Sequence, residues 1–118
     1  MSNLKCHLDR ITHNELFVSS LGDPFWDWAV TGTFYTAVHY VEAYFSKKTP
    51  PVHSSNHPDR DDKIKRDAAL GILWSDYRSL KDQSRYARYE PHIPFSATDL
   101  KKAQEYLDTI KRAIAPLL

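Results

Sequence analysis

The sequence of 118 residues has a single cysteine, only three glycines and almost no net charge. One cysteine excludes an internal disulfide and a cysteine-rich zinc site. Three glycines are about a third of the usual share of roughly 7%, and none are clustered, so the sequence has no Walker A or dinucleotide-binding loop. The scarcity of glycine also argues against a fold of many strands, whose tight turns need it.

The charge balance excludes a strong overall attraction to nucleic acid or membrane, since 16 basic residues face 15 acidic ones. The sequence shows neither an export leader nor an apolar run of about 18 residues, so we expect a cytoplasmic protein without membrane contact. The content of 42% hydrophobic and 26% charged residues is typical of a globular protein. We therefore expect a single domain over residues 1–118.

Apolar residues at helical spacing predict four helices, in residues 3–21, 25–46, 56–89 and 96–118. Proline and glycine separate them, and Ser96-x-x-Asp99 is typical of a helix-capping box. The second helix is apolar nearly all round, so it should be the most buried, with Asp23 as its N-cap and Pro24 at its first position. A glycine inside it, Gly32, predicts a close approach by a neighbouring helix. The predicted fold class is all-α, an antiparallel up-and-down four-helix bundle.

The second helix also carries a stripe of polar residues on one face, which burial alone does not explain. They follow one another at steps of four, four, four and three: Asp27, Thr31, Tyr35, His39 and Glu42. The stripe either faces solvent and backbone partners or lines a cleft. In the second case His39 and Glu42 should lie within reach of His57, Arg60, Arg85 or Arg88.

The third helix carries cations on one side, flanked by Tyr86 and Tyr89. They are spaced by three, four and three residues: Arg78, Lys81, Arg85 and Arg88. Guanidinium groups beside aromatic rings suit phosphate contacts and base stacking. The alternative is a solvated helix face on which Asp82 neutralises Arg78 or Arg85.

The loop before the third helix holds His53 and His57, with three aspartates after them. A metal site would need the two imidazoles to converge with a carboxylate. Aspartates at the start of a helix are already explained by capping and by the helix dipole. We therefore predict neither a metal nor another cofactor.

Three segments together resemble the HEPN (higher eukaryotes and prokaryotes nucleotide-binding) superfamily. They are the run DWAVTGTFYTAVHYVEAYF at 27–45, HPDR at 57–60, and YRSLKDQSRYARYE at 77–90. The similarity spans about residues 12–114, and is strongest to small bacterial proteins that have not been characterised. It implies a helical bundle, frequently a homodimer, that acts on RNA or nucleotides in toxin–antitoxin, defence and mobile-element systems.

Ribonucleases of this superfamily use an arginine followed, after four to six residues, by a histidine. Arg85 and His92 have six residues between them, and Tyr86 replaces the polar residue that usually follows the arginine. The resemblance thus implies at most a metal-independent endoribonuclease, in which His92 would move protons and Arg85 would stabilise the phosphorane. Two such pairs facing one cleft of a dimer would suit both proton transfers.

We therefore expect a HEPN-like domain that binds RNA or nucleotide phosphates through the arginines of its third helix. The predicted binding residues are Arg78, Lys81, Arg88, Tyr89, His39, Glu42, His57 and Arg60. The alternatives are an endoribonuclease of the toxin type using Arg85 and His92, or a module for dimerisation or docking. The partner would then be a second copy, a nucleotidyltransferase or an antitoxin.

Overall fold

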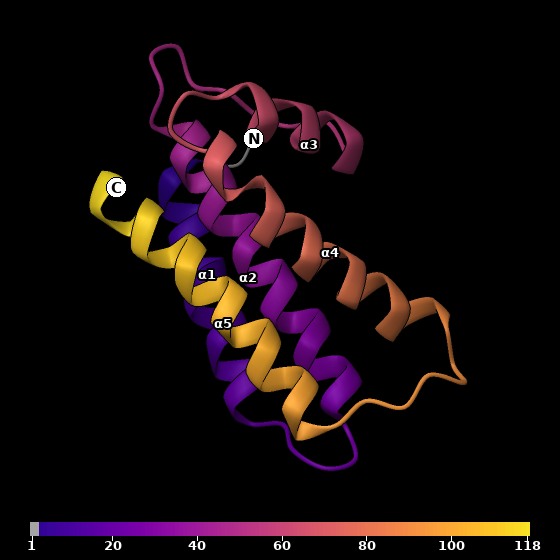
Figure 1. The fold of residues 1–118 in the computed structure, drawn as a ribbon. Helices are drawn as coiled ribbons and strands as arrows, with labels where there is room; N and C mark the ends of the chain where they lie inside the picture. Colours follow the sequence, from indigo (N-terminus) through magenta and orange to yellow (C-terminus); the bar gives the residue numbers. More distant parts are fainter. Residues whose placement is uncertain (1–2) are drawn as a thin grey trace.

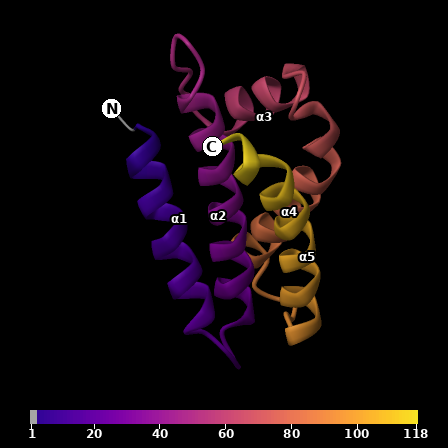
Figure 2. The same cartoon turned by 90° about the vertical axis from the view of Figure 1, so that its left-hand side faces the viewer.

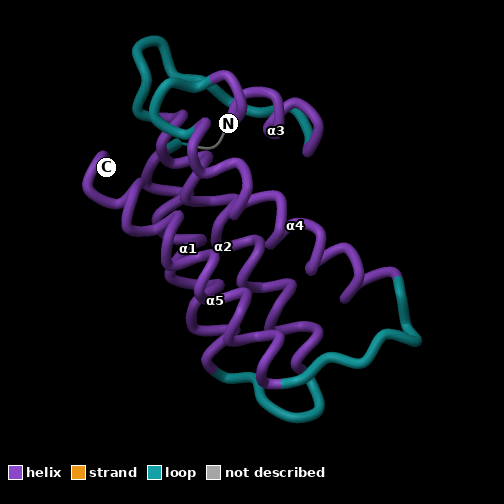
Figure 3. Tube along the Cα trace, in the orientation of Figure 1, coloured by secondary structure: helices purple, strands orange, loops and turns teal. Residues whose placement is uncertain are grey.

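Helices are the only regular secondary structure in residues 3–118, which the computed structural model describes (Figure 3). The all-α prediction is confirmed. The helices are α1 (Leu4–Ser19), α2 (Trp26–Ser46), α3 (His57–Arg66), α4 (Trp74–Tyr89) and α5 (Ala97–Ile114), with short 3-10 turns at Gly71–Leu73 and Ala115–Leu117. Within the described part of the chain, no helix has the length and apolarity needed to cross a membrane.

The helix α2 lies at the centre of the molecule, and α1, α4 and α5 pack around it (Figures 1 and 2). These helices alternate in direction along the chain, whereas the short α3 lies across one end (Figure 1). Fourteen of the 21 residues of α2 are buried, as predicted from its apolar sequence. Its buried threonines donate to backbone carbonyls one turn back, Thr33 to Ala29 at 2.8 Å for example, so their hydroxyls are paired.

The predicted third helix, residues 56–89, is wrong as one element because the chain breaks between α3 and α4. Asp67 ends α3 in an extended conformation, and its carboxylate accepts the backbone N–H groups of Ala69 and Leu70 at 3.0 and 3.1 Å. The Tyr44 hydroxyl at 2.9 Å and the Lys48 ammonium at 2.9 Å hold the same carboxylate from α2 and the loop that follows it. This turn sends the chain from α3, at the end of the molecule, back along α2 as α4.

Capping signals mark the starts of α3 and α5 correctly, whereas the start of α4 at Trp74 has no side-chain cap. Asn56 caps α3 by accepting the N–H of Asp59 at 2.9 Å, and Ser96 with Asp99 forms the predicted capping box of α5. The predicted start of α2 at Asp23 and Pro24 is wrong. Residues 22–25 form a turn closed by a hydrogen bond from Phe25 N to Gly22 O at 2.6 Å, so α2 begins only at Trp26.

The predicted close approach at Gly32 is confirmed. A Cβ at this position would lie 2.7 Å from a methyl carbon of Val18 and 3.1 Å from the ring of Phe17. Side chains of α1 therefore pack directly against the backbone of α2 here, and a side chain at position 32 would force Val18 to move.

We expect Gly32→Ala to lower the free energy of unfolding by about 1 kcal/mol. Overpacking against Val18 costs about 1–3 kcal/mol, and the better helix propensity of alanine returns up to about 1 kcal/mol. Gly22→Ala is the control, because no heavy atom lies within 4 Å of its Cβ position. Urea denaturation of both variants measures the difference, and equal stabilities would contradict the close packing of α1 on α2.

Candidate functional site

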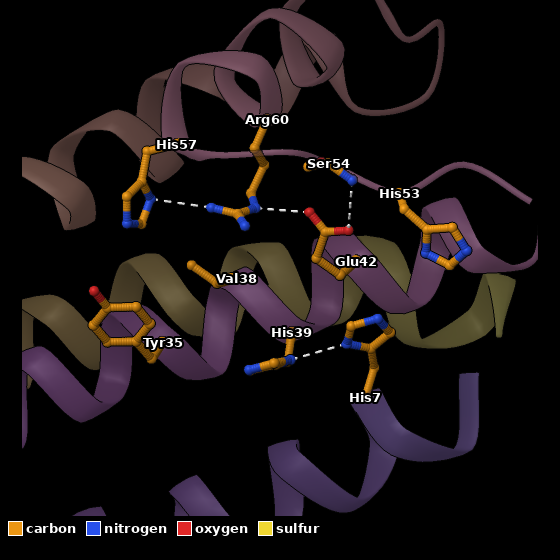
Figure 4. Close-up of a pocket in the computed structure, with 9 residues that line it drawn as sticks. All are labelled: His7, Tyr35, Val38, His39, Glu42, His53, Ser54, His57 and Arg60. Carbon is orange, nitrogen blue, oxygen red and sulfur yellow. Dashed lines mark hydrogen bonds and ion pairs between the residues drawn. The ribbon is translucent and has the colours of Figure 1, made fainter. Parts of the chain in front are cut away.

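A cavity of about 450 Å³ opens where α1, α2 and α3 meet (Figure 4). Its volume is in the range of roughly 300–1,000 Å³ found for small-molecule sites. The wall consists of His7 from α1, Tyr35, Val38, His39 and Glu42 from α2, His53 and Ser54 from the loop, and His57 and Arg60 from α3. Tyr35, His39 and Glu42 of the polar stripe thus face a cavity, and His57 and Arg60 lie opposite them as the cleft interpretation expected.

A buried ion pair joins α2 to α3 across this cavity. Arg60 Nε lies 2.7 Å from Glu42 Oε1, and the two side chains are only 12% and 7% exposed. The other carboxylate oxygen of Glu42 accepts the backbone N–H of Ser54 at 3.4 Å. Because so little solvent reaches the pair, each charge depends on the other for compensation.

His57 is held in one protonation state by its neighbour. An Nη1 atom of Arg60 lies 3.0 Å from His57 Nδ1, and since arginine only donates, this nitrogen must accept. The hydrogen of the neutral ring is therefore on Nε2. Burial lowers the pKa of His57, and the cations Arg60, Lys81 and Arg88 lower it further, which agrees with a neutral ring.

Two imidazoles, His7 and His39, form a pair between α1 and α2. Their Nδ1 atoms are 3.0 Å apart, so one ring donates to the other and the two cannot both be protonated. Burial lowers the pKa of His39 to about 4, with further lowering from His7, Arg10 and Arg60. Burial also lowers the pKa of His7, against the opposing effect of Glu42. Both rings are thus neutral at pH 7.

Arg88 of α4 extends the site beyond the end of the cavity that holds Tyr35 and His57. Its Nη1 donates to the Tyr35 hydroxyl at 2.8 Å, and its Nε donates to the Ser84 carbonyl at 3.2 Å. The guanidinium also lies 5.5 Å from the ring centroid of Tyr35 and 5.1 Å from that of Tyr89. Of the predicted binding residues on α4, Arg88 therefore contacts Tyr35 of the cavity wall, and Tyr89 contacts only Arg88.

The other cations of the predicted stripe have separate surroundings. Lys81 forms an ion pair with Asp61 of α3, and Arg78 lies 3.9 Å from Asp82, the pairing expected for a solvated helix face. Arg85 is exposed, with its guanidinium 5.7 Å from the Tyr86 ring centroid. The four cations therefore do not form one surface. Lys81 pairs with α3, Arg78 and Arg85 face solvent, and only Arg88 contacts Tyr35.

The predicted catalytic pair, Arg85 and His92, is not assembled around this cavity. Arg85 lies on the exposed side of α4, and His92 lies in the loop after it with 77% of its side chain exposed. The nearest charged partner of His92 is Glu90, at 4.0 Å. Neither residue lines the cavity, and their joint role in a dimer stays a prediction.

Five residues of the cavity wall are missing from the predicted site: His7, Tyr35, Val38, His53 and Ser54. Tyr35 was predicted only as part of the polar stripe of the second helix. His7 had a signal, because His7, Ile11 and Val18 are spaced by four and seven residues and form the buried face of α1. The apolar residue next to it in sequence, Leu8, is by contrast 39% exposed. His53 and Ser54 had no such signal, since their loop has no periodicity.

Two buried polar atoms in this wall have no hydrogen-bond partner among residues 3–118, His7 Nε2 and Ser54 Oγ. In the same part of the chain no three His, Cys, Asp or Glu side chains are placed to hold a metal ion together. Comparisons with protein families, with curated proteins and with solved structures find no match for this chain. The fold and the cavity therefore define an all-helical protein with a polar site, and its function rests on the chemistry of that site.

Proposed function

We propose that this chain binds the phosphate group of a nucleotide or of RNA where Tyr35, His57 and Arg88 meet. The observation that carries the proposal is the state of Arg88. In residues 3–118 no ion pair neutralises its charge, yet Tyr35 and Ser84 fix its guanidinium in place. A planar guanidinium that is held in position but has no acid partner suits an oxyanion such as a phosphate, two of whose oxygens it can contact at once.

Two more donors lie at the same place, one on His57 and one on Tyr35 itself. The Nε2–H of His57 is free once Nδ1 accepts from Arg60, and the ring centroids of Tyr35 and His57 are 6.2 Å apart. The Tyr35 hydroxyl accepts from Arg88, so its own hydrogen is available to a ligand. A phosphate has enough acceptor oxygens for all three groups. Exposed Arg85, one turn earlier on α4, could contact a neighbouring phosphate of an RNA strand.

We also infer a relation to the HEPN superfamily. It is supported by the motif resemblance and by the alternating directions of α1, α2, α4 and α5 around a central α2. The short α3 lies outside this arrangement of four helices. A homodimer, an antitoxin or a nucleotidyltransferase partner belongs to the same inference, and light scattering of the purified chain tests the dimer.

We expect Arg88→Ala to weaken binding of single-stranded RNA about tenfold or more, because charge-assisted hydrogen bonds are lost. The slope of log affinity against log salt should fall by about 0.7, the value for one contact to a single strand. Fluorescence anisotropy at several salt concentrations measures both quantities.

Arg112→Ala is the matched control, because Arg112 is an exposed arginine of α5, 80% exposed and paired with Asp108 at 2.8 Å. It removes the same formal charge without touching the cavity. Equal losses for the two variants would show nonspecific attraction, and no loss for Arg88→Ala would overturn the proposed phosphate site.

A further inference from the structure

The two ends of the cavity differ in charge. Next to the end with Tyr35 and His57, Arg88 contacts the wall residue Tyr35 at 2.8 Å without lining the cavity itself, and no acid of residues 3–118 forms an ion pair with it. At the other end the charge of Arg60 is balanced by Glu42 at 2.7 Å, and the His7–His39 pair is neutral. A second anionic group would meet the Glu42 carboxylate at this end and be repelled.

The Glu42 end nevertheless has unused hydrogen-bonding capacity. A carboxylate offers about four acceptor positions, and Glu42 receives one hydrogen bond from Arg60 and one from Ser54. Ser54 Oγ and His7 Nε2 are buried in the same wall without partners among residues 3–118. Figure 4 shows His7, Glu42, Ser54 and His53 gathered at this end of the cavity.

Hydroxyl groups match this set of atoms better than any charged group does. A hydroxyl donates one hydrogen bond and accepts others, so it can serve Glu42 and a donor of the wall at once. Uncharged hydroxyls also cost little to desolvate once they are paired, whereas a charged group would have to be compensated in a buried site.

We propose that the cavity binds a small phosphate monoester that carries hydroxyl groups, with its phosphate at Arg88 and its hydroxyls at Glu42, Ser54 and His7. This assignment rests on the proposed phosphate site and adds the nature and orientation of the ligand. Sugar phosphates and nucleoside monophosphates share this chemistry. The cavity volume of about 450 Å³ suits a ligand of that size.

The test compares three probes by isothermal titration calorimetry with the full chain: methyl phosphate, ribose 5-phosphate and adenosine 5′-monophosphate. Methyl phosphate has the monoester but no hydroxyls. Ribose 5-phosphate is expected to bind at least tenfold more tightly than methyl phosphate, the gain expected from two or more hydrogen bonds. If the natural ligand is a nucleoside monophosphate, adenosine 5′-monophosphate should bind at least as tightly as ribose 5-phosphate. If the natural ligand is a sugar phosphate, adenosine 5′-monophosphate should bind more weakly.

Ser54→Ala should weaken ribose 5-phosphate binding three- to tenfold and leave methyl phosphate binding unchanged. The same variant should unfold at the wild-type temperature or above it, because the hydroxyl that it removes has no hydrogen-bond partner among residues 3–118. The matched control is Ser55→Ala, the exposed serine next in sequence, which should change neither affinity.

Equal affinities of methyl phosphate and ribose 5-phosphate would overturn the hydroxyl assignment, as would a Ser54→Ala variant that binds ribose 5-phosphate like the wild type. These outcomes are separate from a failure at the phosphate end. If Arg88→Ala leaves methyl phosphate binding unchanged while Ser54→Ala weakens only ribose 5-phosphate, the proposed phosphate site is wrong and the hydroxyl subsite stands.

Discussion

Arg60→Ala is expected to lower the free energy of unfolding by about 3–5 kcal/mol, because it leaves the carboxylate of Glu42 buried without its cation. Glu42 has 7% of its side chain exposed, and its remaining partner would be the Ser54 backbone N–H at 3.4 Å. The substitution removes the ion pair that links α2 to α3, and within α3 it also removes the donor to His57 Nδ1. Urea denaturation at pH 7 measures the change.

Arg66→Ala is the matched control on the same helix. Its guanidinium is 82% exposed and lies 3.9 Å from Asp62, so its loss should cost less than about 1 kcal/mol. A double variant, Glu42→Leu with Arg60→Met, should recover most of the stability, because it removes both charges and keeps similar volumes. If Arg60→Ala were as mild as Arg66→Ala, the carboxylate would have to be solvated, and the cavity described here would be more open.

The sequence predicts where a helix begins when the residues that fix its start are neighbours in the chain. The capping box at Ser96 and Asp99 and the N-cap at Asn56 act within one turn, so their residues predict the helix starts. The break at Asp67 is different. Its carboxylate accepts the nearby N–H groups of Ala69 and Leu70, but the partners that anchor it to the rest of the fold, Tyr44 and Lys48, lie about twenty residues away in sequence. Within the chain segment itself, Asp-Ala-Ala-Leu is compatible with a continuous helix.

The site shows the same distinction. Tyr35, His39 and Glu42 could be predicted because polar residues that repeat on one face of a buried helix need partners. The pairing of His39 with His7 could not, because it depends on which face α1 turns toward α2. The close approach at Gly32, where Val18 contacts the α2 backbone, decides which face of α1 is buried. His7 lies on the same buried face, three helical turns before Val18.

The predicted cation stripe shows why shared helical spacing does not define a site. Spacing places Lys81 and Arg88 on one side of α4, but α3 supplies Asp61 for the first and α2 supplies Tyr35 for the second. What distinguishes Arg88, the proposed phosphate-binding residue, is therefore its hydrogen bond to Tyr35 of α2, together with the lack of an ion pair to it among residues 3–118. A single segment of sequence does not contain that information.

Acidification is expected to destabilise the protein between pH 7 and pH 5, through the His7–His39 pair. Burial holds the pKa of His39 at about 4 in the folded chain, against about 6.5 for an exposed imidazole. In this range the unfolded state binds more protons than the folded state, so the free energy of unfolding falls as the pH falls. With solvent screening we expect His39 to account for about 1–2 kcal/mol, and the lowered pKa of His7 acts in the same direction.

The contribution of the pair is isolated by comparing variants over the same pH range. In His39→Gln the titrating ring is gone, so the free energy of unfolding should fall less steeply than in the wild type. His13→Gln changes an exposed histidine of α1 and should keep the wild-type slope. Because α1 packs mainly against α2, its amide hydrogens should lose protection from exchange before those of α5 as the pH falls. A slope in His39→Gln equal to that of the wild type would show that the two imidazoles do not meet as neutral partners between these helices.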